Sequence, residues 1–277
     1  MQKNDLKTAF TAKYPKYGSV IDMFCEANDC TSNWKNVTKL NLVRFIDYLS
    51  ERLARSSVKT YCAMLKSVLS IYSEEIKLPK GYEKILSPKG DISQNTWLNE
   101  SEIKKLMAYT PEIQTERLVQ KQFIMGALTG ARHSDFSRFT KSNIENGRLV
   151  YVSQKTHRKT EVPLAPIVET LLNDTDIHKS VSDPTFNTTL RNICRKCGIN
   201  EIVKLYKAGE ETEGEKWRFI SSHTARRSFA TNLYLRCHDI FLVSKLMGHS
   251  SVEMTATYIM TVGDFNADIK EYFAQFK

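Results

Sequence analysis

The sequence has no run of about 18 apolar residues, the minimum length of a membrane-spanning helix. Its first residues, Met1-Gln2-Lys3-Asn4-Asp5, lack the apolar core of a signal peptide. Internal repeats and low-complexity tracts are also missing, which argues against a solenoid. We therefore expect a protein of the cytoplasm with no membrane partner.

Cysteine is sparse, and its spacing does not form a known metal-site pattern. The chain has 6 cysteines, of which Cys194 and Cys197 make a lone CxxC pair. A zinc finger would need a second pair at matching spacing, and none is present. We interpret the thiols as reduced, as is usual in the cytoplasm, and expect no bound metal.

The composition is that of a globular protein with a basic first third. With 277 residues, 41% of them hydrophobic, the chain is long enough for two domains. The net charge is +9, and residues 1–90 carry 15 lysines and arginines against 9 acidic residues. This excess indicates a polyanionic partner, with nucleic acid favoured over a membrane. The alternative is a mildly basic protein whose charge serves no specific partner.

The first third has the periodicity of helices. From Val58, apolar side chains recur at offsets of 3, 4, 7, 10, 11 and 14 residues, which places them on one helical face. A second helical pattern runs from Leu42 to Leu49. Three basic residues lie off the first face, where they either follow a DNA backbone or simply face solvent: Arg55, Lys59 and Lys66.

The domain boundary is predicted from proline and glycine. Ser87-Pro88-Lys89-Gly90 indicates a linker near residues 86–95. The Asn-Glu-Ser-Glu sequence at 99–102 resembles a capping box that opens a new helix. We therefore predict a helical domain over residues 1–92 and a second domain over residues 93–277.

The second domain is predicted to be rich in helix with one small sheet. Residues 147–153 and 160–164 have the pattern of two hairpin strands joined by the basic turn 155–159. Pro163 indicates that the return strand is an edge strand or ends there. Residues 217–220 are predicted to be a further extended stretch, and the remainder mostly helix.

Arginine and histidine side chains recur near predicted helix ends. Arg132 follows a Thr-Gly pair in a helical setting. Further along, His223 and Arg226 are three residues apart and share one face of a helix that Ser222 would cap. Such pairs occur by chance in many proteins, so each motif alone is a weak signal.

A final motif combines histidine with tyrosine. Gly248 has the place of a helix-ending glycine, and residues 250–253 resemble the capping box of the next helix. His249 would therefore be held in a tight corner, with Tyr258 about two turns into the following helix. The order of arginine, lysine, histidine, arginine, histidine and tyrosine is far more specific than any one fragment.

With these motifs the chain resembles the tyrosine recombinases, also called the phage-integrase family. The matching stretches lie within about residues 125–260 and read TGARHSD, SQKTHRKTEVPL, SSHTARRSFAT and LMGHSSVEMTATYI. The resemblance implies a mainly α fold, in which a helical core-binding (SAM-like) domain precedes an α-rich catalytic domain with a small sheet. Two positions depart from the family pattern, since Ala131 replaces a frequent leucine and Arg227 a frequent histidine.

The resemblance also implies roles for individual side chains. Tyr258 would attack the scissile phosphate and form a covalent 3′-phosphotyrosine. Arg132 and Arg226 would clamp the non-bridging oxygens. Lys155 would protonate the departing 5′ oxygen, and His223 would act as general acid or base. The other assignments are His249 as a donor to the phosphate, Asp135 as a group that orients Arg132 or its helix, and Lys159 as a DNA contact beside Arg55, Lys59 and Lys66.

The implied function is site-specific DNA recombination by an integrase that acts as a tetramer on paired sites in double-stranded DNA. Because the attacking and leaving groups are hydroxyls of protein and DNA, the reaction needs neither ATP nor metal, and we expect no cofactor. The resemblance further implies an origin in a bacterium, phage or other mobile element, a location at the nucleoid, and accessory DNA-bending or directionality proteins as candidate partners.

Other interpretations remain open at this point. A metal-dependent nuclease would rely on Asp174 and Asp176, and a catalytically silent DNA-binding protein would keep the fold without the activity. A type IB topoisomerase would use similar groups but relax strands within one duplex. The apolar face of residues 269–276 is expected either to dock into a neighbouring subunit or to pack on its own domain.

Overall fold

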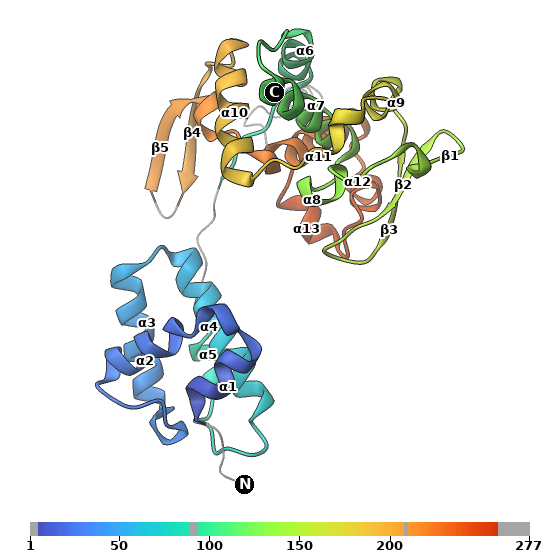
Figure 1. Cartoon of the computed structure of the whole chain (residues 1–277). Coiled ribbons are helices and arrows are strands. Elements are labelled where there is room, and N and C mark those ends of the chain that lie inside the picture. The colour runs from blue at the N-terminus through green and yellow to red at the C-terminus, as the bar shows by residue number, and fades with distance from the viewer. Residues whose placement is uncertain (1–4, 89–93, 208–209, 260–277) are drawn as a thin grey trace, which may run out of the picture. The chain divides into compact units, whose positions relative to one another are not determined.

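Figure 1 shows the computed structural model, which describes residues 5–88, 94–207 and 210–259. It divides into two compact units, the first covering residues 1–93 and the second most of the rest of the chain. Helices dominate both units and strands form two small sheets, so the predicted mainly α class is confirmed. Within the described ranges, no helix combines the length and the apolar character needed to cross a membrane.

The first unit is a set of helices around its own core. Thr38 caps α3 (Lys39–Arg52) by accepting a hydrogen bond from the backbone of Asn41. The predicted apolar face of α4 (Arg55–Ile71) is confirmed, with Val58, Cys62, Leu65, Val68 and Leu69 buried. The remaining elements are α1 (Leu6–Lys13), η1 (Pro15–Tyr17), α2 (Ser19–Asn28), η2 (Trp34–Asn36) and α5 (Tyr82–Ile85).

The predicted linker begins too early in the chain. Leu86 is 1% exposed and belongs to the core of the first unit, directly after α5 ends. Ser87 accepts a hydrogen bond from Lys66 Nζ at 2.8 Å, which ties it to α4 as well. The first unit therefore extends to at least residue 87, because its last apolar side chain is needed to close the core.

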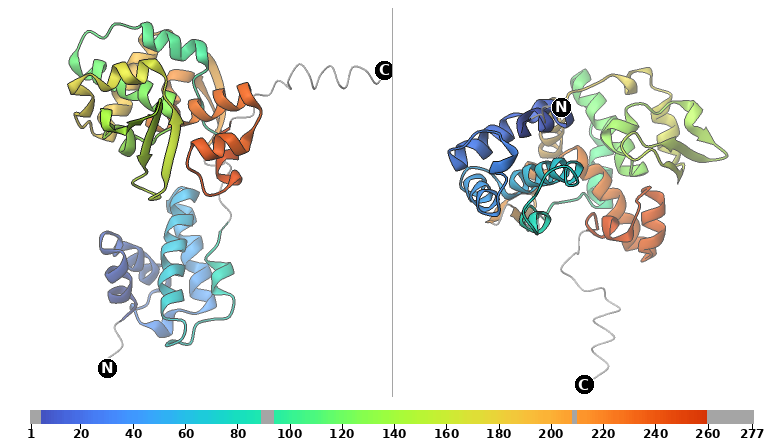
Figure 2. Two further views of the ribbon diagram at one scale, coloured as in Figure 1. Left: turned by 90° about the vertical axis from the view of Figure 1, so that its right-hand side faces the viewer. Right: turned by 90° about the horizontal axis from the view of Figure 1, so that it is seen from below.

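The second unit is larger and contains the three-stranded sheet and most of the two-stranded one (Figure 2). Its capping box is confirmed, since the Asn99 side chain accepts from the backbone of Glu102 while the Glu102 carboxylate accepts from that of Asn99. The elements are α6 (Glu100–Ala108), α7 (Gln114–Thr129), α8 (His133–Phe136), η3 (Lys141–Asn143), β1 (Ile144–Glu145), β2 (Arg148–Val152), β3 (Lys159–Pro163), α9 (Pro166–Leu172), η4 (Thr175–His178), α10 (Asp183–Lys196), β4 (Ile202–Lys207), β5 (Glu210–Glu215), η5 (Lys216–Phe219), α11 (Ser222–Cys237), α12 (Ile240–Leu246) and α13 (Val252–Ala256).

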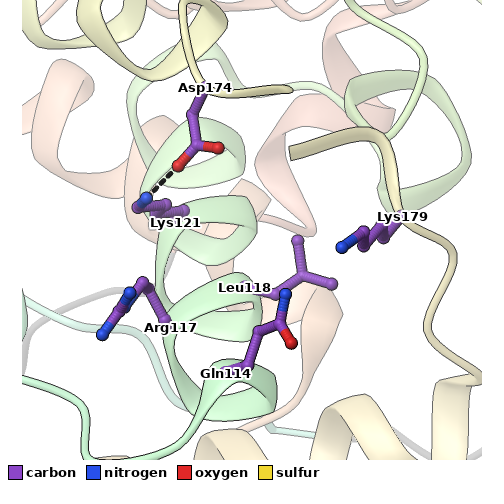
Figure 3. Close-up of a pocket in the computed structure, with 6 residues that line it drawn as sticks. All are labelled: Gln114, Arg117, Leu118, Lys121, Asp174 and Lys179. Atoms are coloured by element: carbon purple, nitrogen blue, oxygen red, sulfur yellow. Dashed lines mark hydrogen bonds and ion pairs between the residues drawn. The ribbon is translucent and has the colours of Figure 1, made fainter. Parts of the chain in front are cut away.

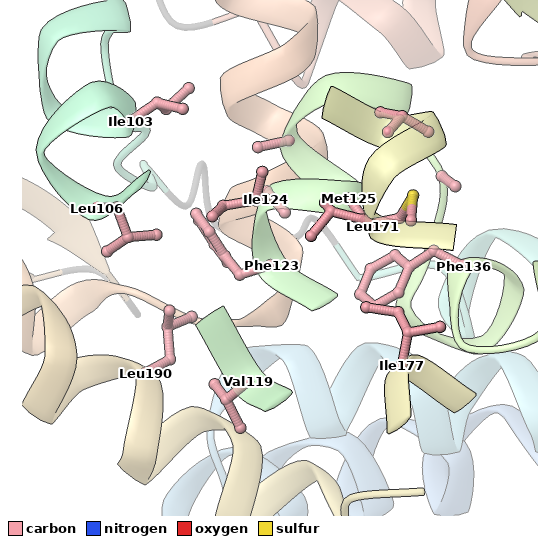
Figure 4. Packing of buried hydrophobic residues seen from close by; sticks show 14 of the residues in the cluster. Ile103, Leu106, Val119, Phe123, Ile124, Met125, Phe136, Leu171, Ile177 and Leu190 are labelled. Carbon is pink, nitrogen blue, oxygen red and sulfur yellow. The ribbon is translucent and has the colours of Figure 1, made fainter. Parts of the chain in front are cut away.

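Helix α7 is the central element of the second unit's core. Figure 4 shows Val119 and Phe123 of α7 among apolar side chains of the surrounding elements, including Leu106 of α6 and Leu190 of α10. A helix buried on nearly all sides cannot show the one-sided pattern of a surface helix. It ends at Gly130, whose φ of 66° is the left-handed conformation that glycine adopts without strain.

The predicted hairpin is confirmed, and the structure adds its register. Strands β2 and β3 are antiparallel, with Arg148 opposite Pro163 and Val152 opposite Lys159. Along β3, Thr160 and Val162 face inward while their neighbours are exposed, as an edge strand requires. Pro163 is the last residue of that strand, where its missing N–H is tolerated. The hairpin lies beside α12, so its turn is held near the last described helices.

Several local predictions are wrong. Residues 217–220 are not extended, because most of them form the 3₁₀ helix η5. The hairpin β4–β5 lies in the remainder predicted to be mostly helix. Its exposed strand β5 reads Glu-Glu-Thr-Glu-Gly-Glu and has no apolar alternation that would indicate a strand. Helix α11 is capped by Ser221 rather than Ser222.

The end of the described chain also differs from expectation. Ser251, not Ser250, caps α13 by accepting from the backbone of Met254. Helix α13 has 5 residues, so Tyr258 follows the helix instead of lying two turns into it. The apolar face predicted at residues 269–276 lies outside the described residues.

Candidate active site

Four of the six predicted catalytic side chains line one cleft of about 590 Å³ in the second unit: Arg132, Lys155, His223 and Tyr258. They come from four separate places in the fold, namely the start of α8, the β2–β3 turn, the first turn of α11 and the residue pair after α13. Chain segments more than 100 residues apart therefore supply one concave surface.

Arg132 is held by a short chain of hydrogen bonds. Its Nη1 donates to Ser153 Oγ at 3.1 Å, and that hydroxyl donates to Asp135 Oδ2 at 3.0 Å. The other oxygen of Asp135 accepts from the backbone N–H of Gln154 at 2.8 Å. Asp135 is 1% exposed, so a buried carboxylate links the start of α8 to the hairpin that carries Lys155.

Arg226 is the most enclosed cation of the site, at 1% exposure. Its Nη1 donates to the carbonyl of Gly130, and its Nη2 donates to the carbonyl of Met247 at 2.7 Å. Nη2 also lies 2.8 Å from Nε2 of His249. A buried arginine without a carboxylate partner depends on such acceptors, because desolvation alone would destabilise its charge.

His249 is brought next to the other groups by the corner between α12 and α13. Gly248, with a φ of 62°, turns the chain there, and a Cβ at this position would approach Thr160 Oγ1 to 2.4 Å. Burial, Arg226 and then Arg132 lower the pKa of His249 to about 4. The ring is therefore neutral at pH 7.

Tyr258 lies at the edge of this cluster and is half-buried. Its ring centroid is 5.1 Å from that of His249 and 5.6 Å from Cζ of Arg226. Arg227, which sequence reasoning gave no role, lies on the same ring at 5.1 Å and donates to the carbonyl of Thr257 at 3.0 Å. The phenol thus has three basic side chains around it.

His223 and Lys155 stand on the open side of the cleft. Partial burial and then the charge of Arg227 lower the pKa of His223, which favours the neutral imidazole that a general base needs. Lys155 is exposed in the hairpin turn. Lys159, the other lysine of this hairpin, pairs with Glu161 at 3.2 Å and is not among the lining residues.

The predicted DNA contacts of the first unit are on α4. Arg55 and Lys59 are exposed near its start. Lys66 is half-buried and donates to Ser87, so its ammonium already has a protein partner. Arg55 and Lys59 are therefore more exposed to solvent than Lys66.

A second hollow, of about 410 Å³, lies at the other end of α7 and holds none of the six candidates. Figure 3 shows its lining, where Lys121 forms an ion pair with Asp174. Asp174 is one of the two carboxylates on which the nuclease alternative rested. Among the described residues, no three His, Cys, Asp or Glu side chains are grouped so that they could hold a metal ion.

Several residues to which the sequence gave no role contact the predicted ones. Ser153 links Arg132 to Asp135, Thr255 contacts His249, and Arg227 contacts the Tyr258 segment. Only Arg227 carried a signal, since it was singled out as a departure from the family pattern. Serine and threonine are too common for their positions to be informative before the partners are known.

Known proteins with similar sequences are recombinases and integrases. A tyrosine recombinase of Pseudothermotoga lettingae is 25% identical over 260 residues, which cover 88% of this chain and 85% of that protein. The XerC tyrosine recombinase of Neisseria meningitidis serogroup B is 28% identical over 244 residues, with 82% and 77% covered. The integrase of Escherichia phage P2 is 23% identical over 142 residues, and the match spans only 36% of its length.

Solved structures share the fold. The XerH site-specific recombinase, in a post-cleavage complex with a palindromic difH substrate, superposes with a TM-score of 0.63 at 17% identity and covers 97% of this chain and 78% of its own. A lambda integrase dimer bound to a COC′ core site gives a TM-score of 0.64 at 17% identity, with 92% and 91% covered.

A comparison with family models identifies the family of the chain. Residues 96–262, more than half of the chain, match the phage integrase family. This segment contains all six predicted catalytic residues, including the four that line the cleft. The chain therefore belongs to the phage integrase family, that is, to the tyrosine recombinases.

Proposed function

We propose that this protein is a site-specific DNA recombinase that cleaves and rejoins DNA through a covalent 3′-phosphotyrosine. The observation that carries the proposal is the convergence of Arg132, Lys155, His223 and Tyr258 on one cleft, with Arg226 and His249 packed beside Tyr258. A phenol, an accessible lysine and two arginines are the groups that phosphodiester transfer without a bound cofactor requires.

In the proposed reaction the Tyr258 oxygen attacks the phosphorus atom, and the bond from phosphorus to the 5′ oxygen breaks. The phenol proton passes to neutral His223, and Lys155 Nζ gives a proton to the departing 5′ oxygen. Arg132 and Arg226 stabilise the charge that builds on the non-bridging oxygens. The reverse reaction, with a 5′ hydroxyl from a second duplex, rejoins the strand.

Arg226 must change partners for this role. In the structure its Nη atoms donate to two carbonyls and to His249, whereas its buried Nε has no hydrogen-bond partner among the described residues. A phosphate oxygen would satisfy such unpaired N–H groups in a charge-assisted hydrogen bond, which is stronger than a bond to a neutral carbonyl. We therefore infer that Arg226 exchanges some of these protein acceptors for a phosphate oxygen when DNA binds.

DNA is the proposed partner, and basic residues of both units are proposed to contact its phosphates. Arg55 and Lys59 on α4 and Lys159 on the hairpin are exposed and carry the positive charge that phosphate contacts need. Strand exchange between two duplexes requires four cleavage events, so a tetramer on paired sites is proposed as the active assembly. Accessory DNA-bending or directionality proteins are proposed as further partners.

A suicide-substrate assay tests the proposal. A nicked duplex of a candidate recombination site, which loses a short strand on cleavage, should trap wild-type protein as a covalent adduct on a denaturing gel. Tyr258→Phe should form no adduct, since phenylalanine has no nucleophilic oxygen. Tyr234→Phe is the matched control, because Tyr234 packs in the same small apolar cluster, and it should form adduct normally.

The outcomes separate the alternatives. Adduct formation by Tyr258→Phe would assign the nucleophile to another residue, and binding without any adduct would favour a silent DNA-binding protein. An adduct that leads only to relaxation of supercoiled plasmid, without exchange between duplexes, would favour a topoisomerase.

A further inference from the structure

His249 is hydrogen-bonded at both ring nitrogens in the interior of the second unit. Its Nε2 lies 2.8 Å from Nη2 of Arg226, and its Nδ1 lies 2.8 Å from Oγ1 of Thr255. His249 is 8% exposed and Thr255 is 0% exposed. These two contacts therefore fix the ring in a site that water reaches only at its edge.

The contact with Arg226 determines where the ring proton lies. A guanidinium has donors only, so Nε2 must accept and cannot carry a proton. The proton of the neutral ring is then on Nδ1, and Nδ1–H donates a hydrogen bond to Thr255 Oγ1. The pKa of about 4, which burial and the two arginines produce, agrees with a neutral ring.

This arrangement conflicts with the role proposed for His249. A donor to the phosphate on the Arg226 side needs a proton on Nε2, which is absent in the DNA-free state. A neutral ring with a proton on Nε2 has a lone pair on Nδ1, and a buried lone pair needs a donor. The only side chain that hydrogen-bonds Nδ1 within the described chain is Thr255.

A hydroxyl can serve in either state. The Thr255 oxygen accepts from Nδ1–H in one orientation, and its own hydrogen donates to bare Nδ1 after rotation about the C–O bond. Its position is well fixed, since Thr255 lies within α13, whose start is capped by Ser251. No movement of the ring or the helix is needed to pass from one state to the other.

We propose that Thr255 is a positioning residue that permits His249 to exchange between two tautomers. In the DNA-free protein the proton is on Nδ1, and Arg226 donates to Nε2. When a phosphate takes over the Arg226 donors, Nδ1 releases its proton to solvent, Nε2 takes one up, and Thr255 turns from acceptor to donor. The net charge of the ring is unchanged. The second state rests on the proposed function, whereas the first does not.

The first state is tested by nitrogen NMR of the full chain labelled with ¹⁵N-histidine, with His249→Gln used to assign the His249 signals. At pH 7 the wild-type Nδ1 shift should be that of a protonated nitrogen and the Nε2 shift that of a bare one. The reverse pattern, or two protonated nitrogens, would overturn the proposal. This spectrum needs no change at Thr255, so it decides the first state even if a Thr255 variant does not fold.

The second state is tested with two variants of similar size. Thr255→Val removes the hydroxyl but keeps the shape, and Thr255→Ser keeps the hydroxyl. Relative to wild type, Thr255→Val should form covalent adduct about tenfold more slowly, the scale of one lost hydrogen bond, while DNA binding is unchanged. Thr255→Ser should restore the rate to within about threefold. Equal rates for Thr255→Val and wild type would refute the exchange.

A spectrum of DNA-bound protein separates this result from the proposed function. Tyr258→Phe bound to the duplex that wild type cleaves should show the proton on Nε2 of His249. If wild type forms no adduct with any duplex, the proposed function fails, but the DNA-free spectrum still reports whether Nδ1 of His249 carries the proton that Thr255 would accept in a hydrogen bond. A proton that stays on Nδ1 in the bound complex would refute the tautomer exchange alone.

Discussion

The guanidinium of Arg227 lies on the ring of Tyr258, with Cζ 5.1 Å from the ring centroid, and its Nη1 donates to the carbonyl of Thr257 at 3.0 Å. Thr257 directly follows α13, which ends at Ala256. Arg227 therefore holds the segment that carries the proposed nucleophile to α11. Thr231 of α11 adds a second tie, donating to the Tyr258 carbonyl at 3.3 Å.

We predict that Arg227→Ala slows adduct formation by about tenfold or more, because Tyr258 loses both a positioning contact and a nearby positive charge. The rate of adduct formation by Arg227→Lys should lie between those of wild type and Arg227→Ala, since lysine keeps the charge but not the planar fork. The rate of adduct formation on a suicide substrate measures both effects. Arg236→Ala is the matched control on the same helix, because Arg236 pairs with Glu100 at the surface and does not line the cleft.

If Arg227→Ala forms adduct at the wild-type rate, the contact with the Thr257 carbonyl does not position Tyr258. Limited proteolysis is a second test of the contact between Arg227 and the Thr257 carbonyl. Cleavage of the Arg227→Ala chain after α13 should be faster than in Arg236→Ala, since the tie to α11 is lost.

The two proposed clamp arginines should differ in what their loss does to folding. Arg132→Lys and Arg226→Lys should each lower cleavage by on the order of 10²–10³, because lysine lacks the bidentate fork. Arg226 is buried and donates to three protein acceptors. The single ammonium group of a lysine cannot reach all three, so the free energy of unfolding of Arg226→Lys should also fall by about 1–3 kcal/mol. Urea denaturation distinguishes the two variants, and equal stabilities would contradict this account of Arg226.

The hairpin was predictable from sequence because its signal is local. The apolar run in 147–153, the alternation in 160–164 and the basic turn between them predict that β2 pairs with β3. The apolar face of α4 is a similar case, since one side packs on a core and the other meets solvent. Both signals can be read without knowledge of the neighbours.

The contacts inside the site could not be predicted in the same way. Motif order indicated that Arg226 and His249 belong together, but not that Arg226 would donate to Nε2 of His249 in the DNA-free state. That pairing depends on the α12–α13 corner and on Gly130 at the end of α7, segments far apart in the chain. The prediction that Tyr258 lies two turns into a helix was also wrong. Helix α13 begins one residue later than predicted, after its cap at Ser251, and ends before Tyr258.

The low pKa of His249 predicts acid sensitivity. Its pKa in the folded chain is about 4, while an unperturbed histidine has a pKa of about 6.5. Between these values the unfolded chain binds a proton that the folded chain does not, so the free energy of unfolding decreases as pH falls through this window. The loss approaches about 3 kcal/mol at pH 4 for this group.

Urea denaturation at pH 7 and pH 5 measures this effect, with His249→Gln as the comparison. The glutamine variant should start less stable but lose less stability between the two pH values, since it has no proton to gain at this position. Identical losses in both proteins would mean that His249 is not the group responsible.

The choice between Lys155 and Lys159 as the proposed general acid can be tested by changing the leaving group. Lys155 is exposed in the turn and lines the cleft, while Lys159 pairs with Glu161 on β3. Replacing the 5′ oxygen of the scissile phosphate by sulfur gives a leaving group that departs without a proton. Lys155→Ala should cleave the normal substrate on the order of 10²-fold more slowly and the sulfur substrate at nearly the wild-type rate.

Lys159→Ala is the matched control, because it removes the same charge from the same hairpin outside the cleft. This substitution should weaken DNA binding modestly, as the loss of one phosphate contact does. The ratio of its cleavage rates on the normal and the sulfur substrates should equal that of wild type. Rescue by sulfur in Lys159→Ala but not in Lys155→Ala would transfer the role to the β3 lysine. Rescue in neither variant would mean that the proton reaches the leaving oxygen from elsewhere in the cleft, where His223 is the next group able to carry it.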